Sequence, residues 1–363
     1  MTMPTTLTPA EVFAPGEYLR DELEARGWTG EEFAEIIGRP VQVVSEILNG
    51  RKQIVPETAL AIADALGTSA ELWVNLQTAY NLHEAKAVRP ASSDVARRSA
   101  LRNVVPVAEL RRRGWLPDTN DISQLECAVK ELLGVDEIGA VPRFAVAARR
   151  SNRETVLFTP QQTAWLARVR LLAENKSVKP FDRRLALSVA SDLAHRIYHP
   201  SDLGELAAWL AECGVVLVTL LPLRSSKMDG AAIQLENGTP VIGLSSRGDR
   251  MDGYVFTLLH ELAHICLGHL EACGVTADED IGTLEPAVGF EAEANQQAAK
   301  WIMPEDAVIP TGRRPTMASV LETASRYRVH PSFVIGRIQH AEKDYSILRR
   351  SIAKVRPFVA CEN

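Results

Sequence analysis

The sequence predicts a mainly helical α+β protein, in which a front bundle of short helices precedes a larger domain with a small β-sheet. Residues 16–85 read as short helices separated by cap and turn residues. Three short segments at 215–220, 231–235 and 240–244 have the β-branched or apolar character of strands. The run at 255–268 is mostly apolar but contains two histidines and a glutamate, which indicates a functional helix.

The composition is that of a globular protein. With 363 residues, 46% of them apolar and 24% charged, the chain has room for two or three domains and a substantial core. No apolar stretch reaches about 18 residues, and residues 1–10 carry no basic group ahead of an apolar segment. The five cysteines are odd in number and scattered, which suits a reducing compartment. We therefore expect a cytoplasmic protein without a membrane partner.

Start and stop signals divide the front region into helices. Thr29 and Glu32 have the spacing of a capping box, and the turn at 38–40 puts a proline at the first position of the next helix. The later boundaries are marked by Gly50, Pro56 and Gly67. The residues at the spacing of a helix-turn-helix are Ala34, Gly38, Val44, Ser45 and Ile47. This spacing predicts a helix-turn-helix domain over residues 1–85.

The second helix of that motif and its flanks carry the candidate DNA contacts. These are Arg39, Gln42, Val43, Glu46, Arg51 and Lys52. Residues 1–85 hold five Lys or Arg against thirteen Asp or Glu, a net charge of −8, which weakens attraction to phosphates. Residues 86–113 reverse the sign, with eight basic residues against two acidic ones. This basic segment can follow a DNA backbone or neutralise the acidic domain, so binding of operator DNA and docking to a protein both stay open.

The pentapeptide at 260–264 predicts a metal site. His260 and His264 lie one turn apart on one face of a helix, so both imidazoles can reach a single Zn²⁺. Glu261 points beside the metal, where a general base must stand to take a proton from water that the metal activates. Ligand type alone does not exclude Mn²⁺.

The helix predicted at 290–303, which ends before Pro304, offers the third ligand. Its small and apolar stripe includes Glu291 and Asn295, whereas Glu293 lies on the solvent-facing side. We therefore predict that Glu291 binds the metal, that Asn295 orients a group at the site, and that Glu293 is a surface charge.

His269 is the rival for the third position. It lies nine residues after His260, whereas the extended form of the histidine motif places its third histidine ten residues after the first. We predict that His269 caps the helix or supports a ligand rather than binding the metal itself.

Residues 256–264, the glutamates at 291 and 293 with Asn295, and the closing segment at 301–304 together closely resemble the ImmA/IrrE metallopeptidases. The resemblance implies a zincin-like metallopeptidase domain in which His260, His264 and Glu291 hold the metal and Glu261 is catalytic. It also implies a protein substrate, namely a DNA-bound repressor or an antitoxin. The front region, at 39–52, 56–60 and 72–77, resembles HigA-type antitoxins of the Xre class, which implies a homodimer on a palindromic operator.

The predicted organisation follows from these motifs. We expect a helix-turn-helix domain at 1–85, a basic linker at 86–115, a metallopeptidase domain at 116–310 and a C-terminal helical segment at 311–363. Within the peptidase domain, residues 116–212 form a helical scaffold and residues 213–310 supply the sheet and the metal helices. The strand at 240–245 is our candidate for an exposed edge that pairs with the substrate backbone.

We therefore predict a zinc-dependent endopeptidase with a DNA-binding domain. Its cleavage of a repressor or antitoxin would control transcription, or a toxin–antitoxin or stress response. The alternative is a DNA-binding antitoxin or transcriptional regulator whose metal domain is sensory or inactive. The intact base at Glu261 counts against that alternative, because a purely structural metal site does not need one.

Overall fold

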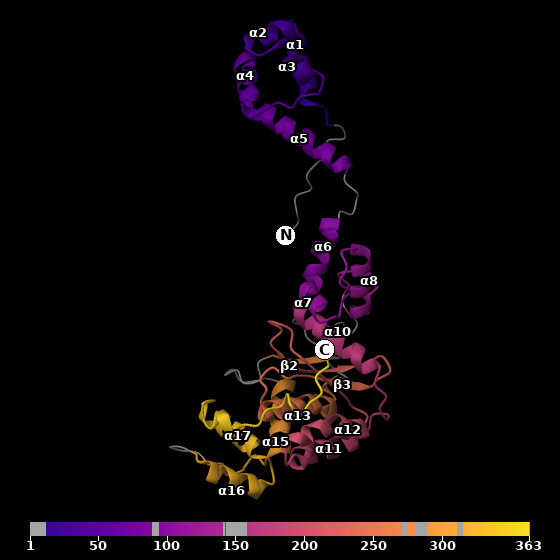
Figure 1. The fold of residues 1–363 in the computed structure, drawn as a ribbon, viewed down its shortest axis with the longest axis vertical. Coiled ribbons are helices and arrows are strands. Elements are labelled where there is room, and N and C mark those ends of the chain that lie inside the picture. Colours follow the sequence, from indigo (N-terminus) through magenta and orange to yellow (C-terminus); the bar gives the residue numbers. More distant parts are fainter. Residues whose placement is uncertain are drawn as a thin grey trace. The chain divides into compact units, whose positions relative to one another are not determined.

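The computed structural model separates the chain into two compact units, Met1–Ser93 and Asp94–Asn363, and each unit is described by itself (Figure 1). The structure describes residues 12–88, 94–140, 142, 158–270, 275–279, 289–310 and 315–362. In this part of the chain, no helix is both long and apolar enough to cross a membrane.

The front unit is a helical bundle, and its helices begin and end close to the predicted start and stop residues. Its helices are α1 (Pro15–Arg26), α2 (Gly30–Ile36), α3 (Val41–Leu48), α4 (Pro56–Leu66) and α5 (Ala70–Val88). The capping box is confirmed, since the Thr29 hydroxyl accepts from the backbone N–H of Glu32 and the Glu32 carboxylate accepts from the backbone N–H of Thr29. Gly67 ends α4 in a left-handed conformation at φ 71°, as the sequence predicts.

Apolar residues from α1, α2 and α3 meet in the core of this unit. Phe33, Val44 and Ile47 are almost completely buried there. α1 approaches α3 so closely that a Cβ atom at Gly16 would lie 2.1 Å from the backbone oxygen of Ile47. This packing fixes the second helix of the motif, α3, and leaves Val41, Gln42 and Ser45 on its other face exposed.

The second unit consists of a sheet between two helical layers. Its helices are α6 (Asp94–Val104), α7 (Val107–Arg112), α8 (Ile122–Leu133), α10 (Pro160–Glu174), α11 (Arg183–Arg196), α12 (Leu206–Glu212), α13 (Met251–Leu267), α15 (Phe290–Ile302), α16 (Met317–Tyr327) and α17 (Pro331–Glu342), with 3-10 helices η1 (Pro200–Glu205) and η2 (Arg349–Ser351). Its strands are β1 (Val216–Leu220), β2 (Met228–Gln234), β3 (Pro240–Ser245) and β4 (Val275–Glu279). The predicted fold class, mainly helical with a small sheet, is confirmed.

The strand order β1-β3-β2-β4 corrects one expectation. β3 pairs in parallel with β1 and antiparallel with β2, so the strand at 240–245 is central and cannot accept a substrate backbone. The hairpin predicted between β2 and β3 is present. β4, which the sequence did not predict, pairs antiparallel with the other side of β2 and forms that edge of the sheet.

Side chains of the sheet enter two separate apolar clusters. Val216 and Val218 face the cluster that contains α10, whereas Leu217 faces the cluster that contains α13. Because α13 crosses both β2 and β3, the helix with the two histidines lies directly on the sheet. α15 packs along α13 on this side, and α17 also contacts α13 (Figure 1).

The segment expected as a basic linker, 86–115, contains two helices of the second unit. α6 and α7 place Leu101, Val105 and Leu110 in the same apolar cluster as α8 and α10. Their arginines are therefore displayed from a folded surface rather than from a flexible connection. Residues 89–93 of this segment lie outside the described residues.

Candidate metal centre

The helix α13 carries the two histidines and the glutamate between them into the interior. Its apolar residues pack against the sheet, and Gly268 ends it in a left-handed conformation at φ 83°. His260, Glu261 and His264 are all 0% exposed. Burying three titratable groups in an apolar helix is costly unless they are paired or bind a metal.

The helix α15 brings a carboxylate to the histidines. Gly289 precedes it at φ 68°, a conformation that favours glycine. The Phe290 ring stacks on His269 with a centroid separation of 4.3 Å. This contact holds the first turn of α15 against the end of α13 and directs Glu291 toward the two histidines.

Three ligand-type atoms converge between these helices. Glu291 Oε2 lies 3.2 Å from His260 Nε2 and 3.5 Å from His264 Nε2, and the two Nε2 atoms are 3.0 Å apart. Zinc binds nitrogen and oxygen ligands at about 2.0 to 2.2 Å, so tetrahedral ligand atoms lie roughly 3.3 Å from one another. Two imidazoles and one carboxylate at this separation fit a divalent cation.

Asn295 fixes the tautomer of the first histidine. Its Oδ1 lies 3.0 Å from His260 Nδ1, and because an amide oxygen only accepts, the proton of His260 belongs on Nδ1. The Nε2 lone pair then points into the cluster, where a metal ligand needs it.

Contacts with His269 and Glu293 fix the tautomer of the second histidine, His264. His264 Nδ1 lies 2.9 Å from His269 Nδ1, and His269 Nε2 lies 3.3 Å from Glu293 Oε2. When His269 Nε2 donates to Glu293, its Nδ1 accepts from His264 Nδ1. His264 then keeps the lone pair of Nε2 for the cluster. Glu293, expected as a surface charge, is 57% exposed but makes this contact, which the sequence analysis missed.

The electrostatics of the cluster favour an ionised carboxylate at Glu291 and a neutral imidazole at His264. Burial alone would raise the pKa of Glu291, but the close approach of the His260 and His264 rings outweighs it and holds that pKa well below its usual range. Burial lowers the pKa of His264, which disfavours the imidazolium. The Glu291 side chain is 44% exposed, so the cluster meets solvent at the carboxylate.

Glu261 lies against the sheet beside the cluster. A Cβ atom at Gly230 of β2 would lie 2.5 Å from Thr257 Cγ2 and 3.1 Å from Glu261 Oε1. Only glycine lets the strand approach α13 this closely, so Gly230 shapes the space around the Glu261 carboxylate. The sequence offered a weak signal, because a glycine inside a strand often marks such an approach.

His330 caps a helix. Its Nδ1 accepts from the backbone N–H of Ser332 at the start of α17. This contact gives the side chain a structural role at that position.

The structure places the candidate DNA-binding residues on the outside of the front unit. Arg39, Arg51 and Lys52 are exposed, while Val43 packs partly against the core. The other two are already in contact: Gln42 Nε2 donates to Glu46 Oε1 at 3.1 Å, and Lys52 Nζ lies 3.8 Å from Glu46 Oε2. The free face of α3 therefore presents a connected polar group rather than isolated side chains.

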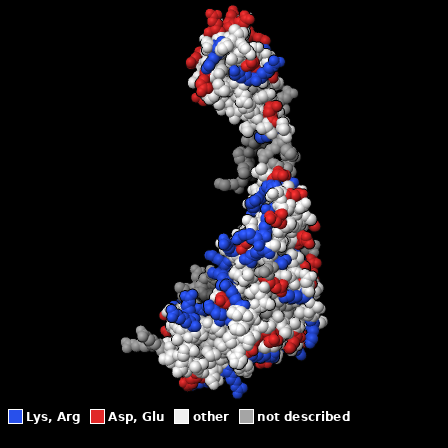
Figure 2. All heavy atoms as spheres, in the orientation of Figure 1, with Lys and Arg blue, Asp and Glu red and all other residues white. Residues whose placement is uncertain are grey.

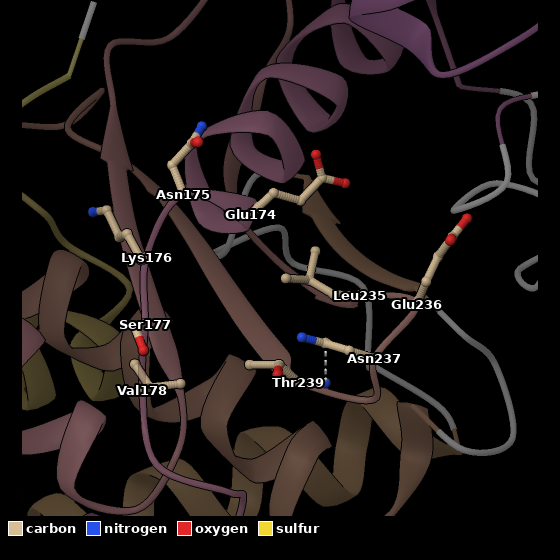
Figure 3. Close-up of a pocket in the computed structure, with 9 residues that line it drawn as sticks. All are labelled: Glu174, Asn175, Lys176, Ser177, Val178, Leu235, Glu236, Asn237 and Thr239. Carbon is tan, nitrogen blue, oxygen red and sulfur yellow. Dashed lines mark hydrogen bonds between the residues drawn. The ribbon is translucent and has the colours of Figure 1, made fainter.

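A polar hollow of about 480 Å³ opens in the second unit, away from these residues (Figure 3). It lies between the end of α10 and the β2–β3 hairpin, and Asn237 accepts from the backbone N–H of Thr239 at its rim. None of the cluster residues lines it, so it does not bear on the metal chemistry.

Comparison with known proteins decides the family. Residues 213–339 match the family described as the IrrE N-terminal-like domain, a metallopeptidase family, and this range contains the whole cluster. The second unit therefore contains an IrrE N-terminal-like domain. The predicted resemblance is thereby confirmed, and so is the front domain, because residues 19–73 match the helix-turn-helix family.

The front unit is also similar to individual proteins, and the matches lie in the helix-turn-helix region. An uncharacterised helix-turn-helix transcriptional regulator, YddM of Escherichia coli, is 31% identical over 72 residues, 20% of this chain and 77% of the relative. Antitoxin HigA-1 of Vibrio cholerae is 38% identical over 84 residues, 21% of this chain and 79% of the relative. A HigA-family antidote protein of Coxiella burnetii with a solved structure is 37% identical, covering 21% of this chain and 83% of that one, with a TM-score of 0.20.

Proposed function

We propose that this protein is a metal-dependent endopeptidase, that its front domain brings it to operator DNA, and that it cleaves a repressor or an antitoxin there. Such cleavage would act in transcriptional control, a toxin–antitoxin system or a stress response. The observation that carries the proposal is the meeting of His260, His264 and Glu291 with Glu261 buried beside them.

The donor set supports a catalytic rather than a structural metal. Structural zinc sites usually have four protein ligands, whereas catalytic sites use three and leave a position open. His260, His264 and Glu291 are three, and Glu291 is the member that solvent reaches. Zn²⁺ suits these ligands best, and Mn²⁺ is also compatible with them. A bound divalent ion would supply Lewis acidity, which lowers the pKa of water and polarises the scissile carbonyl.

The chain itself supplies the proton transfers. Glu261 accepts a proton from the attacking water as the water oxygen bonds to the carbonyl carbon of the substrate. The same carboxyl group then gives that proton to the leaving nitrogen as the carbon–nitrogen bond breaks. The products are a carboxylate and an amine. Gly230 allows β2 to lie against Glu261, so the strand restricts how far this carboxylate can turn.

Two observations support the DNA-binding part. The front unit matches proteins named as a transcriptional regulator and as an antitoxin over most of their length. In the structure, the free face of α3 presents Gln42 and Glu46, with exposed basic residues at Arg39 and Arg51 on its flanks. Those groups have the chemistry to read base edges and to contact phosphates, respectively. A homodimer on a palindromic operator would be the corresponding assembly.

Glu261→Gln tests the peptidase proposal. The substitution keeps the size of the side chain but cannot accept a proton, so cleavage should fall by about 10²-fold or more while the metal and the fold are retained. The test incubates the full-length protein with the repressor or antitoxin encoded beside it and analyses the products by mass spectrometry. Elemental analysis of both proteins supplies the metal content.

The two results separate the proposed functions. Loss of cleavage with full metal content supports Glu261 as the base. If the wild-type protein holds one metal but leaves every neighbouring regulator intact, the metal domain is sensory or inactive and the protein is a DNA-binding regulator. Undiminished cleavage by Glu261→Gln would remove the mechanism described above.

A further inference from the structure

Three segments that are distant in sequence meet on one side of the second unit. The loop between β1 and β2 contacts the loop between β3 and α13, because Arg247 Nη1 donates to the backbone oxygen of Lys227 at 2.9 Å. The C-terminal segment joins them, since Arg356 Nη2 donates to the backbone oxygens of Ser246 at 3.0 Å and Arg247 at 3.4 Å. Asp249 Oδ1 accepts from the backbone N–H of Arg356 at 3.0 Å.

The backbone of these loops is held in unusual conformations. Ser225, Lys227 and Asp249 have φ angles of 60°, 54° and 45°, although none of them is glycine. Such conformations are unfavourable for residues other than glycine and persist only where the surroundings hold them. Ser226 is 1% exposed, which anchors the first loop between its two strained residues. The side chains on either side of Ser226 are therefore displayed from fixed positions.

Five basic side chains project from this assembly, and we refer to them as the basic band. They are Arg224, Lys227, Arg247, Lys354 and Arg356. Arg247 and Lys354 have carboxylates nearby, at 3.8 Å from Asp229 and 3.7 Å from Asp249. Arg224 and Lys227 are exposed, and neither side chain pairs with a carboxylate in the described part of the chain. Figure 2 shows Lys and Arg atoms gathered along this side of the unit, continuing toward the arginines of α6 and α7.

The clustering does not follow from a basic composition. Residues 1–93 hold seven of the 40 Lys and Arg and thirteen of the 46 Asp and Glu, which leaves 33 of each sign for residues 94–363. A neutral unit that gathers its positive charges on one side has a local field that attracts polyanions.

We propose that the basic band is a second nucleic-acid contact surface, which binds the phosphate backbone of duplex DNA without reading its sequence. This inference rests on the proposed DNA-binding function and adds a surface that the helix-turn-helix does not supply. The front unit has seven basic residues against thirteen acidic ones, so it is poor in the charge that DNA affinity normally requires. The band compensates for that deficit from the peptidase unit.

A phosphate backbone fits the band better than an acidic peptide does. Arginine matches phosphate oxygens with a planar fork of donors. Three of the five residues are arginine, and of these Arg247 and Arg356 already use some of their donors on backbone oxygens of the band. Peptide recognition usually adds main-chain pairing at a strand edge or pockets for side chains. The five residues of the band lie in loops and in the C-terminal segment, outside the strands of the sheet.

The band also lies close to the candidate catalytic residue along the chain. Lys227 immediately precedes β2, and the third residue after it, Gly230, is the glycine that meets Glu261. DNA held on the band would therefore run past the start of the strand that borders Glu261. A repressor bound to the same DNA would be kept near the peptidase site, which raises its effective concentration there.

The test replaces Arg224, Lys227 and Lys354 together by glutamine in the full-length protein. These side chains are exposed, and none of them belongs to the metal cluster. The matched control replaces three exposed basic residues outside the band, Lys179, Arg184 and Lys343, by glutamine. Binding to a random-sequence duplex is measured by fluorescence anisotropy over a series of salt concentrations. A third protein carries Arg39→Gln, Arg51→Gln and Lys52→Gln in the front unit.

Each phosphate contact contributes about 0.9 to the slope of log affinity against log salt, so the band variant should lose roughly 2 to 3 units of slope. Near physiological salt its affinity should fall about 10- to 100-fold, while the control stays unchanged. Thermal unfolding checks that all variants are folded. An unchanged slope in the band variant overturns the inference.

The remaining outcomes keep this inference distinct from the front domain's role. If the band variant loses slope and the front-unit variant does not, the basic band binds DNA and the proposed helix-turn-helix contact fails. If only the front-unit variant loses slope, the band is not a DNA surface. If the band variant keeps its duplex affinity but no longer binds a polyglutamate peptide, the band recognises acidic protein segments and the DNA proposal is wrong.

Discussion

His269 Nδ1 lies 2.9 Å from His264 Nδ1, so the proton on one ring determines the proton on the other. His264 can keep a free Nε2 for a metal only when its own proton is on Nδ1. His269 must then accept at Nδ1 and carry its proton on Nε2, which faces Glu293 Oε2 at 3.3 Å. A carboxylate on the surface of α15 thus sets the tautomer of His264, a buried candidate ligand, through the His269 ring.

Glu293→Ala should therefore weaken metal binding without abolishing it. The metal-to-protein ratio should stay at its wild-type value, while the dissociation constant rises about 10-fold, because groups that orient ligands typically account for 10- to 100-fold in affinity. A competition titration with a chromophoric chelator measures the constant. Glu305→Ala is the matched control. Glu305 follows α15 and is an exposed carboxylate that pairs with Lys300 of that helix. Glu293→Gln should restore part of the affinity, since its amide oxygen can still accept from His269.

His260→Ala and Glu291→Ala should each abolish stoichiometric metal. Either change leaves two of the three converging ligands, and the affinity of such a site is too low to survive dialysis. Elemental analysis of dialysed protein provides the measurement, with circular dichroism to confirm the fold. Should Glu293 prove essential and Glu291 dispensable, the assignment of ligands on α15 is wrong.

The local parts of this site were predictable from the sequence because helical periodicity alone determines them. His260 and His264 are four residues apart, so they share a face wherever this segment is helical. The small residues around Glu291 and Asn295 indicate which side of α15 faces inward. The relay through His269 was not predictable in full, because it depends on how the chain turns after Gly268 and meets another helix. Glu293 is more than half exposed, so its pattern is that of a surface residue.

The errors in the fold arose where distant segments decide the outcome. β3 is central because β1 pairs with it in parallel, and no local pattern reveals that lateral order. β4 is short and ends in two acidic residues, so only its pairing with β2 identifies it as a strand. The many basic residues of 86–115 indicated a linker. The structure instead places Leu101 and Leu110 of this segment in the core of the second unit, where both are 0% exposed.

Gly230→Ala should impair both stability and catalysis. The added methyl group would lie 2.5 Å from Thr257 Cγ2 and 3.1 Å from Glu261 Oε1, so β2 or α13 must shift. Overpacking of this kind costs about 1 to 3 kcal/mol of unfolding free energy. Gly253→Ala is the matched control on α13, because an added Cβ atom there meets nothing within 4 Å. Alanine is a better helix former than glycine, so this variant should be as stable as the wild-type protein or more stable by up to about 1 kcal/mol. Denaturant unfolding and a cleavage assay measure the two effects, and equal behaviour of the two variants would contradict the close approach.

Gln42→Ala and Lys52→Ala should separate the two parts of DNA recognition by α3. Gln42 donates to Glu46 Oε1, and Glu46 in turn lies 3.8 Å from Lys52, so the three side chains form one polar group on α3 and the turn that follows it. If Gln42 reads a base edge, its loss should reduce discrimination between the operator and a scrambled duplex by about 5- to 100-fold with an unchanged salt slope. Lys52→Ala should instead weaken binding to both duplexes and lower the slope by about 0.9, as expected for one phosphate contact. Anisotropy titrations of both duplexes at several salt concentrations provide the data. If neither substitution changes the preference or the slope, α3 does not enter the groove, and the front unit is a protein-docking module.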